Sequence, residues 1–414
     1  MRKLSEPLIS FVMTCLLSFT VLAHESCNEM ETWDTSMGMC MPLAMKEMPM
    51  RMLMVQGHSF LVESAESSLR GRSDLAAPNM FMIDLGTSVS DSHYLNLDFM
   101  GTLERWTFPN AGYPELLQIG EANQAGQPFI DAQHPHSSPI MGLTFSDTIR
   151  LQQDSANHLK IFFAPRGEST DGPVAFMHRI TGQANPDAPL GHHVGQDVGH
   201  ISSTVLGASL ALGHWHYELS GFNGTEPLPD AVDLPMGPFN SYALRIIDEP
   251  SADTTWMLSS AEVKSSDPAV VEAFRYSASL YTQHAVLKNW QLHNSLIFGS
   301  TTNYDGASQL SSWCEEFLLT RDQSSIWGRL EVLQRTAAEL SISSPTNTND
   351  GKWIEALTLG YTHELQNWQH SKLQAGAALT LDFVPNEFSA AYGSSTPILG
   401  RVFLQLSGHQ MWDL

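Results

Sequence analysis

The sequence predicts an all-β protein, namely a transmembrane antiparallel β-barrel of about sixteen strands with long extracellular loops. Three observations predict this fold. The chain opens with an export signal, its body alternates apolar and polar residues with period two, and long and short connections alternate between the strand segments. An even number of antiparallel strands, with tight turns at one end and long loops at the other, is the plan of a bacterial outer-membrane barrel.

The export signal occupies residues 1–23. Arg2 and Lys3 provide a positive start, and the uncharged stretch that follows ends in Val21-Leu22-Ala23. These features predict a signal peptide that is cleaved after Ala23. The alternative is a membrane-anchoring helix, which needs ~20 apolar residues, whereas the uncharged run has only about 16.

The charge of the mature chain excludes one class of partner. Loss of Arg2, Lys3 and Glu6 reduces 21 basic and 44 acidic side chains to 19 and 43, so the net charge becomes −24. So acidic a chain does not bind nucleic acid by neutralising phosphates. No later segment approaches the length of an apolar membrane helix, so the mature protein is either a periplasmic protein or a barrel.

The body of the chain, residues 55–414, carries the strand pattern. Within residues 80–89, Phe81, Ile83 and Leu85 fall on one face of a strand and Asp84 falls on the other. Similar segments are residues 95–104, 214–221 and 373–381. The alternative is a large soluble sandwich or propeller, but the sequence contains no repeat of the length of a propeller blade.

The connections between these segments alternate in length. The longer ones are predicted near residues 66–78, 105–138, 166–198, 224–238, 338–350 and 385–397, with shorter members of the same series near 265–270 and 303–307. The turns between them are mostly short and polar. This rhythm favours a barrel with both chain ends on the periplasmic, short-turn side.

Residues 24–54 form a methionine- and cysteine-rich head, which we expect in the periplasm. The head holds nine of the 19 methionines of the chain. Thioethers are soft ligands that select Cu(I), and M-x-M spacing brings two sulfurs toward one ion. The candidate ligands are Met37, Met39, Met48 and Met50. The alternative is an adaptable hydrophobic packing surface, which methionine also provides.

The mature chain keeps three cysteines. Cys27 and Cys40 lie close together in the head, and an oxidising compartment favours a disulfide between them. A pair of thiolate metal ligands is the alternative. Cys314 is expected to be a small apolar residue or a free thiol.

A second set of candidate metal ligands lies in and around the two longest loops. These residues are His134, His136, His178, His192, His193, Asp197 and His200. Neutral imidazole with carboxylate suits Zn(II) or Cu(II), but no H-E-x-x-H or similar spacing fixes a geometry. The alternative is that the loops fold into the lumen and the histidines hydrogen-bond one another and the wall.

Charged residues are also expected on the lumen wall. The inward positions would include Asp84, Asp98, Glu104, His214, His216, Glu218, Arg275, Glu316, Arg329 and Glu331. Rings of charged side chains tune conduction in wide barrels, or they simply pair with one another. The sequence contains no nucleophile elbow, P-loop or dinucleotide-binding motif, so we predict a protein that is not an enzyme.

Several segments resemble an uncharacterised family of exported bacterial outer-membrane-type proteins found near copper and heavy-metal resistance systems. The segments that carry the resemblance are SCNEMETWDTSMGMCMPL, HYLNLDFMGTLERWTFPNAGYPELLQIGE, DAQHPHSSPIMGLTFSDTI, FFAPRGESTDGPVAFMHR, NPDAPLGHHVGQDVGHISSTV and EEFLLTRDQSSIWGRLEVLQRT. The resemblance covers nearly the whole mature chain. It implies an envelope location and a metal connection, and it assigns no residue a role.

The sequence therefore predicts an outer-membrane barrel that serves as a channel or envelope component linked to copper or heavy-metal handling. Its expected partners are outer-membrane lipid, the barrel assembly machinery and metal ions, with copper as the candidate cofactor. The alternative is a periplasmic His-rich metal-binding β-protein or metalloenzyme.

Overall fold

The structure is a computed structural model of the chain. It describes residues 31–34, 39–42, 51–136, 139–152, 156–225, 228–232, 234, 236–264, 272–287, 289–304, 307–343 and 348–414. The predicted signal peptide with its cleavage site lies outside the described residues. Met37, Met48, Met50 and Cys27 also lie outside them.

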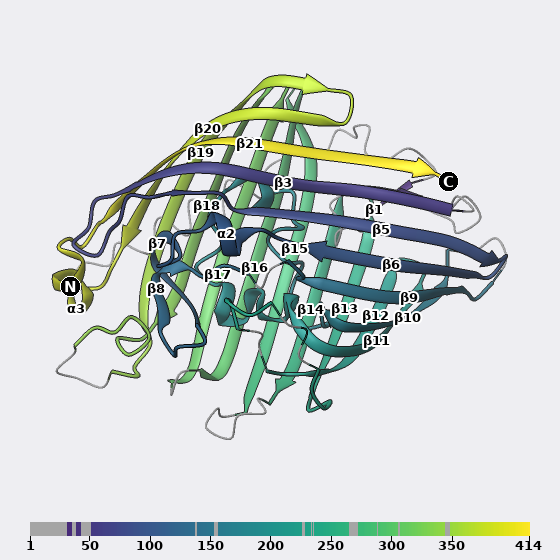
Figure 1. The fold of residues 1–414 in the computed structure, drawn as a ribbon, viewed down its shortest axis with the longest axis horizontal. Helices are drawn as coiled ribbons and strands as arrows, with labels where there is room; N and C mark the ends of the chain where they lie inside the picture. The colour runs from purple at the N-terminus through teal and green to yellow at the C-terminus, as the bar shows by residue number, and fades with distance from the viewer. Residues whose placement is uncertain are drawn as a thin grey trace.

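Sixteen antiparallel strands of the described chain close into one barrel, as predicted (Figure 1). They are β3 (Arg51–Glu66), β5 (Asn79–Ser90), β6 (His93–Gly101), β9 (Gly142–Arg150), β10 (His158–Gly167), β11 (Ser202–Leu212), β12 (Trp215–Asn223), β13 (Ser241–Ser251), β14 (Thr254–Val263), β15 (Ala273–Leu287), β16 (Trp290–Tyr304), β17 (Ala307–Arg321), β18 (Ser324–Arg335), β19 (Lys352–Trp368), β20 (Ser371–Phe383) and β21 (Ile398–Asp413). The two-residue strand β4 (Leu75–Ala76) adds to β3.

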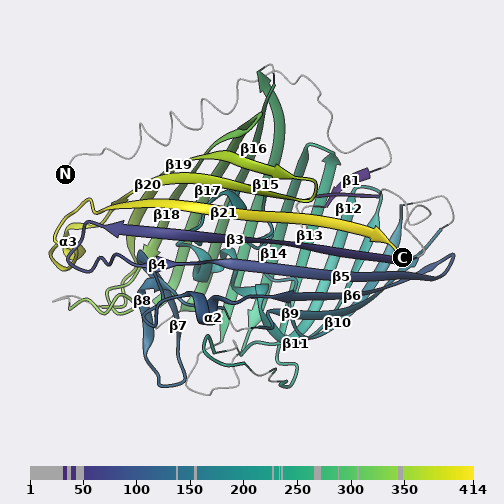
Figure 2. The same cartoon turned by 45° about the horizontal axis from the view of Figure 1, so that its top comes forward.

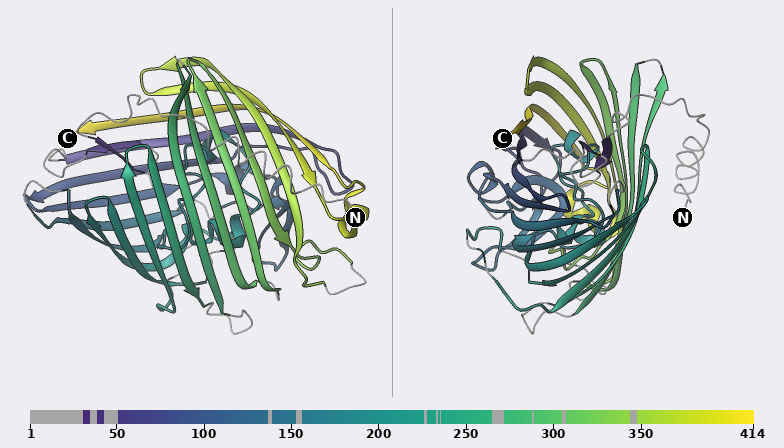
Figure 3. Two further views of the ribbon diagram at one scale, coloured as in Figure 1. Left: turned by 180° about the vertical axis from the view of Figure 1, so that it is seen from behind. Right: turned by 90° about the vertical axis from the view of Figure 1, so that its right-hand side faces the viewer.

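The first and last strands close the barrel. β21 pairs with β3 along its length, from Leu399 opposite Glu66 to Asp413 opposite Met52. Figure 2 shows the two strands side by side, and the left panel of Figure 3 shows the opposite wall. Closure matters because it leaves no strand edge with unpaired backbone groups.

Alternation along the strands separates an apolar outer face from a mixed inner face. In β5, Ile83 and Leu85 are exposed on the outside, while Met82 and Asp84 are buried inside. Every barrel strand carries at least one exposed large apolar residue. One set is Val55, Ile83, Leu95, Phe145, Ile161, Leu206, Leu219, Leu244, Leu258, Leu280, Leu296, Trp313, Ile326, Leu359, Leu379 and Val402. We call this set the apolar girdle.

The two ends of the barrel differ. At one end the strands join through short turns, for example between β17 and β18, and the two ends of the barrel chain meet there. The amide of Leu414 donates to the carbonyl of Arg51 over 3.0 Å. At the other end most connections are longer, as predicted, and the two longest are residues 102–141 and 168–201. We call these ends the short-turn end and the loop end.

The boundary between head and barrel differs from the prediction. The prediction ended the head at residue 54, but β3 begins at Arg51, so Met52 and Met54 belong to the barrel wall. Farther toward the N-terminus, β1 (Glu31–Asp34) and β2 (Met39–Pro42) form a separate two-stranded sheet that contains Met39 and Cys40. Cys314 is buried and makes no disulfide. Among the described residues, no helix is long and apolar enough to cross a bilayer.

Candidate functional site

Two long loops fold into the barrel and fill much of its lumen. We call them L2 (residues 102–141) and L3 (residues 168–201), and together the plug. Their elements are α2 (Glu104–Thr107), β7 (Tyr113–Ala122), β8 (Pro128–Gln133), η2 (Gly182–Ala184), η3 (His192–Gln196) and η4 (Val198–His200). Most of their described residues are buried, and α2 lies within the outline of the barrel in Figures 1 and 2.

A buried carboxylate on the wall holds L3 in place. Glu316 of β17 accepts two hydrogen bonds from the Arg179 guanidinium of L3, both 3.0 Å long. It also accepts one from Arg329 of β18 at 3.0 Å and one from the Thr181 hydroxyl at 2.8 Å. Paired and hydrogen-bonded in this way, three charges can be buried together.

A wall arginine on the last strand makes a second attachment. Arg401 donates to Asp187 of L3 at 3.2 Å and to the Pro114 carbonyl of L2 at 2.7 Å. The Tyr113 hydroxyl of L2 donates to the same Asp187 carboxylate. Arg335 of β18 likewise donates to carbonyls of both loops, those of Leu117 and Leu190. The wall therefore holds L2 and L3 against each other.

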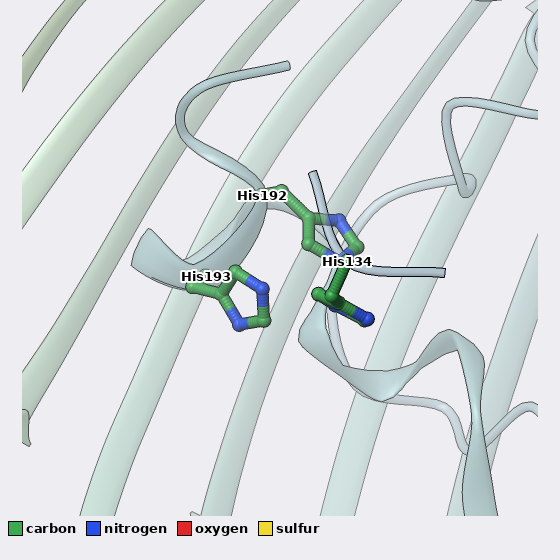
Figure 4. A group of neighbouring side chains, drawn as sticks. All are labelled: His134, His192 and His193. Carbon is green, nitrogen blue, oxygen red and sulfur yellow. The ribbon is translucent and has the colours of Figure 1, made fainter. Parts of the chain in front are cut away.

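Five histidines gather where L2 meets L3, and we call them the histidine cluster. They are His134 and His136 of L2 with His192, His193 and His200 of L3. The ring centroids of His192 lie 4.5 Å from His193 and 4.9 Å from His200. The His134 ring lies 5.6 Å from His193, and the His136 ring lies 5.2 Å from His200. Figure 4 shows His192 and His193 projecting from one turn toward His134.

Three carboxylates lie beside these rings. Glu121 contacts His134 and lies 3.4 Å from Nδ1 of His193. Glu104 lies 2.7 Å from Nδ1 of His136. Asp197 lies between His192 and His200, at 3.6 and 3.8 Å from their Nδ1 atoms. Carboxylates behind imidazoles are the usual way in which proteins orient histidine ligands for a metal.

Several imidazole nitrogens in this buried cluster lack a hydrogen-bond partner among the described residues. They are Nε2 of His136, Nε2 of His193, Nε2 of His200 and Nδ1 of His192. In His136 and His200 the other nitrogen faces an oxygen, so in the neutral form of each ring that nitrogen carries the proton and Nε2 offers a lone pair. A buried polar atom without a partner costs about 1–3 kcal/mol, so several in one place indicate a ligand.

The protonation of the cluster also suits a metal. Burial lowers the pKa of His200 to about 3 despite nearby Asp197, and it lowers the pKa of His193 well below its usual value. Burial lowers the pKa of His192 as well, against the attraction of Asp197. Burial would also lower the pKa of His134, but Glu121 outweighs it and raises that pKa. Three imidazoles are therefore neutral near pH 7, which is the form that binds metals.

Two overlapping donor groups could each hold an ion. His134, His192 and His193 offer ligand atoms within 4.8 Å of one another. So do His192, Asp197 and His200, and His192 is common to both groups. Imidazole with carboxylate is a donor set for Zn(II) or Cu(II). The sequence identified all five of these ligand candidates, and the structure places them together.

The remaining predicted residues lie elsewhere. His178 lies on L3 against a separate cavity near the short-turn end. Met39 belongs to β2 of the separate β1–β2 sheet and not to the barrel sheet. Glu121 was missed, because no spacing in the sequence links it to a histidine thirteen or more residues away. Of the predicted wall residues, Glu104 instead belongs to α2 of the plug and His214 to the turn before β12.

Gly195 allows the backbone of η3 to lie close to strand β16 of the wall. Its φ is +72°, and a Cβ there would lie 2.5 Å from the Ser300 amide nitrogen of β16. We expect Gly195→Ala to displace η3 and expose L3 to limited proteolysis, because both backbone strain and steric overlap oppose the native position.

Gly126 provides the matched control. It has nearly the same φ, +73°, but a Cβ there would meet nothing within 4 Å. Gly126→Ala should therefore show the strain alone, about 1 kcal/mol, and leave L3 protected. Equal protease sensitivity in the two variants would contradict the close approach at Gly195.

The rest of the lumen is a cavity of about 1190 Å³ that reaches the short-turn end, and we call it the vestibule. Asp84, Asp98, His216 and Glu218 line its wall, so these four predicted lumen residues do face inward. Its floor is L3, through residues that include Thr170, Val174, His178, Ile180 and Gln183.

Comparison with solved structures identifies the architecture. An anion-selective porin from Comamonas acidovorans aligns with 87% of this chain and 98% of its own, at a TM-score of 0.50 and 10% identity. OmpF from Salmonella typhi, solved in complex with daunomycin, aligns over 86% and 97%, at a TM-score of 0.51 and 7% identity. The chain has the porin fold. No family model matches it, and comparison with curated proteins finds no relative, so the family resemblance inferred from the sequence stays a prediction.

Proposed function

We propose that this porin-fold chain is an outer-membrane protein whose lumen is closed by its own plug. The apolar girdle supports this most directly. Exposed large apolar side chains on all sixteen barrel strands are costly in water, and they match the lipid-facing band of outer-membrane barrels. In this orientation the short-turn end faces the periplasm and the loop end faces outward. Lipid and the barrel assembly machinery are then its partners.

Electrophoresis tests this proposal. A closed barrel resists detergent, so the protein extracted in mild detergent is expected to migrate faster unheated than after boiling. Extraction should also require detergent. Release with the soluble periplasmic fraction would contradict the proposal and favour the alternative, a periplasmic metal-binding β-protein or metalloenzyme.

A second observation supports a role in metal handling. The histidine cluster combines unpartnered imidazole nitrogens with carboxylates behind them. We propose that it holds Cu(II) or Zn(II), and that the ion fastens L2 to L3. The copper or heavy-metal connection implied by the resemblance, and Cu(I) binding by Met37, Met39, Met48 and Met50, belong to the same proposal.

Metal-dependent stability tests the histidine cluster. An ion that binds only the folded protein stabilises it by about 2.7 kcal/mol at a concentration of 100 times its Kd. Zn(II) or Cu(II) should therefore raise the temperature at which the fast-migrating form is lost. The variant His192→Ala with His193→Ala should lose this increase, because it removes two of three ligands in one group.

His409 serves as the control because it is an exposed histidine at the short-turn end of β21. His409→Ala should keep the full metal-dependent increase. If the double variant is stabilised as much as this control, the ion binds elsewhere and the proposed site is wrong.

A further inference from the structure

A group of methionines lies between the vestibule and the plug. They are Met80 and Met82 of β5, Met100 of β6, Met141 of L2 and Met177 of L3, and we call them the methionine cluster. All five are at most 8% exposed. Three of them lie on inward wall positions, where polar side chains are usual in a wide barrel.

Strand register brings these side chains together. Met82 is directly opposite Met100 in the antiparallel ladder, and Met80 is directly opposite His58. Cross-strand neighbours have Cβ atoms about 4.5–5.5 Å apart, so flexible thioether chains can turn both sulfurs toward one ion.

Part of the methionine cluster borders the vestibule. Met80, Met82 and Met100 all line that cavity. The Gln56 amide donates to the Met82 sulfur over 3.4 Å, so this thioether already accepts from a polar group. Closer to the short-turn end, Met52, Met54 and Met411 also line the cavity, and Met54 is directly opposite Met411. A soft ion that enters at this end meets thioethers along one side of the vestibule.

The methionine cluster borders the histidine cluster through one aromatic ring. Phe176 packs against the methionines, and its ring centroid lies 5.9 Å from that of His192 and 6.4 Å from that of His136. Leucine and isoleucine would fill the same apolar space. A concentration of sulfur at this junction therefore points to ligand chemistry in addition to packing.

We propose that the methionine cluster is a binding site for a soft monovalent cation, Cu(I) or its analogue Ag(I). The ion enters from the short-turn end and is held by Met82 and Met100, with Met80 and Met177 within the same group. All of its ligands are methionines of β5, β6, L2 and L3, and none is a histidine. It is therefore separate from the divalent site proposed at the histidine cluster.

Silver titration of the full chain in detergent tests the proposal. Met82→Leu combined with Met100→Leu keeps bulk and apolarity but removes both sulfurs. This variant should bind Ag(I) with one ion fewer than wild type, as measured by competition with a chelator. Met257→Leu is the matched control, because Met257 is also buried and lines the vestibule but packs against Val174 and Ile247. It should bind as wild type does.

Oxidation mapping gives a second measurement. It reports on each methionine separately, so silver bound by the methionines of the head does not affect the result. Bound Ag(I) should protect Met82 and Met100 from peroxide, detected as sulfoxide in their own peptides, and should leave Met257 unprotected. Both variants should keep the fast-migrating folded form and Zn(II) stabilisation, which isolates this test from the histidine cluster. Unchanged Ag(I) stoichiometry in the double variant, or protection that does not depend on silver, would overturn the proposal.

Discussion

Replacing Glu316 with alanine is expected to destabilise the plug more than any other single substitution in the wall. The change leaves the Arg179 and Arg329 guanidiniums buried without the carboxylate that both contact at 3.0 Å. Breaking a buried ion pair by removing one partner costs about 3–5 kcal/mol. Because Arg179 belongs to L3, the expected result is an L3 that proteases cut and a folded form lost at lower temperature.

Glu315 provides the control on the same strand. It lies next to Glu316 but faces the other side of β17 and is only partly buried. Glu315→Ala should keep the thermal stability and protease resistance of wild type. Glu316→Gln should fall between the two, since it keeps the shape and loses the charge. If Glu316→Ala is as stable as Glu315→Ala, L3 does not depend on this ion pair.

Removing L3 is expected to convert a closed barrel into an open channel. Gly167 and Ser202 are directly opposite each other in the β10–β11 ladder, so a two-residue hairpin turn can replace residues 168–201. Barrels of sixteen strands are wide enough to leave an aqueous channel when no loop fills them. The shortened protein should therefore conduct ions across planar bilayers much more strongly than the full chain.

Shortening the exposed tip of the β7–β8 hairpin around Gly126 is the control for this deletion. Residues 124–127 of this tip are exposed, and a Cβ at Gly126 would meet nothing within 4 Å, so the lumen should stay filled and conductance should stay low. Both shortened proteins must show the fast-migrating folded form. A folded L3 deletion that conducts no better than wild type would mean that L2 alone closes the lumen.

Much of the fold could be predicted from the sequence because strand geometry imposes a period of two on every residue. Ile83 and Asp84 differ in polarity because one faces outward and the other inward, and this local difference is visible without a structure. The head boundary was placed a few residues too late, because it was drawn from composition and not from the alternation of residues along a strand. Met52 and Met54 resemble the methionine-rich head in composition, yet their alternate spacing belongs to β3.

The candidate site was less predictable because it depends on contacts between two loops. The histidines of residues 134–136 and 192–200 could be identified by type, but nothing periodic in L2 or L3 shows that these segments meet. His178 illustrates the limit, because it lies in the same loop as His192 and faces the vestibule. Glu121 was missed for the same reason, because only the folded plug brings this carboxylate close to His193.

The position of Arg401 has a consequence for assembly order. β21 follows the other fifteen barrel strands in the sequence, and it pairs with β3, the first of them. Its Arg401 also contacts Asp187 and the Pro114 carbonyl. Such distant pairings form late, because the intervening chain must first be ordered. We therefore expect β3 and β21 to pair after L2 and L3 have entered the lumen, and a chain whose plug folds slowly to keep these two strands unpaired for longer.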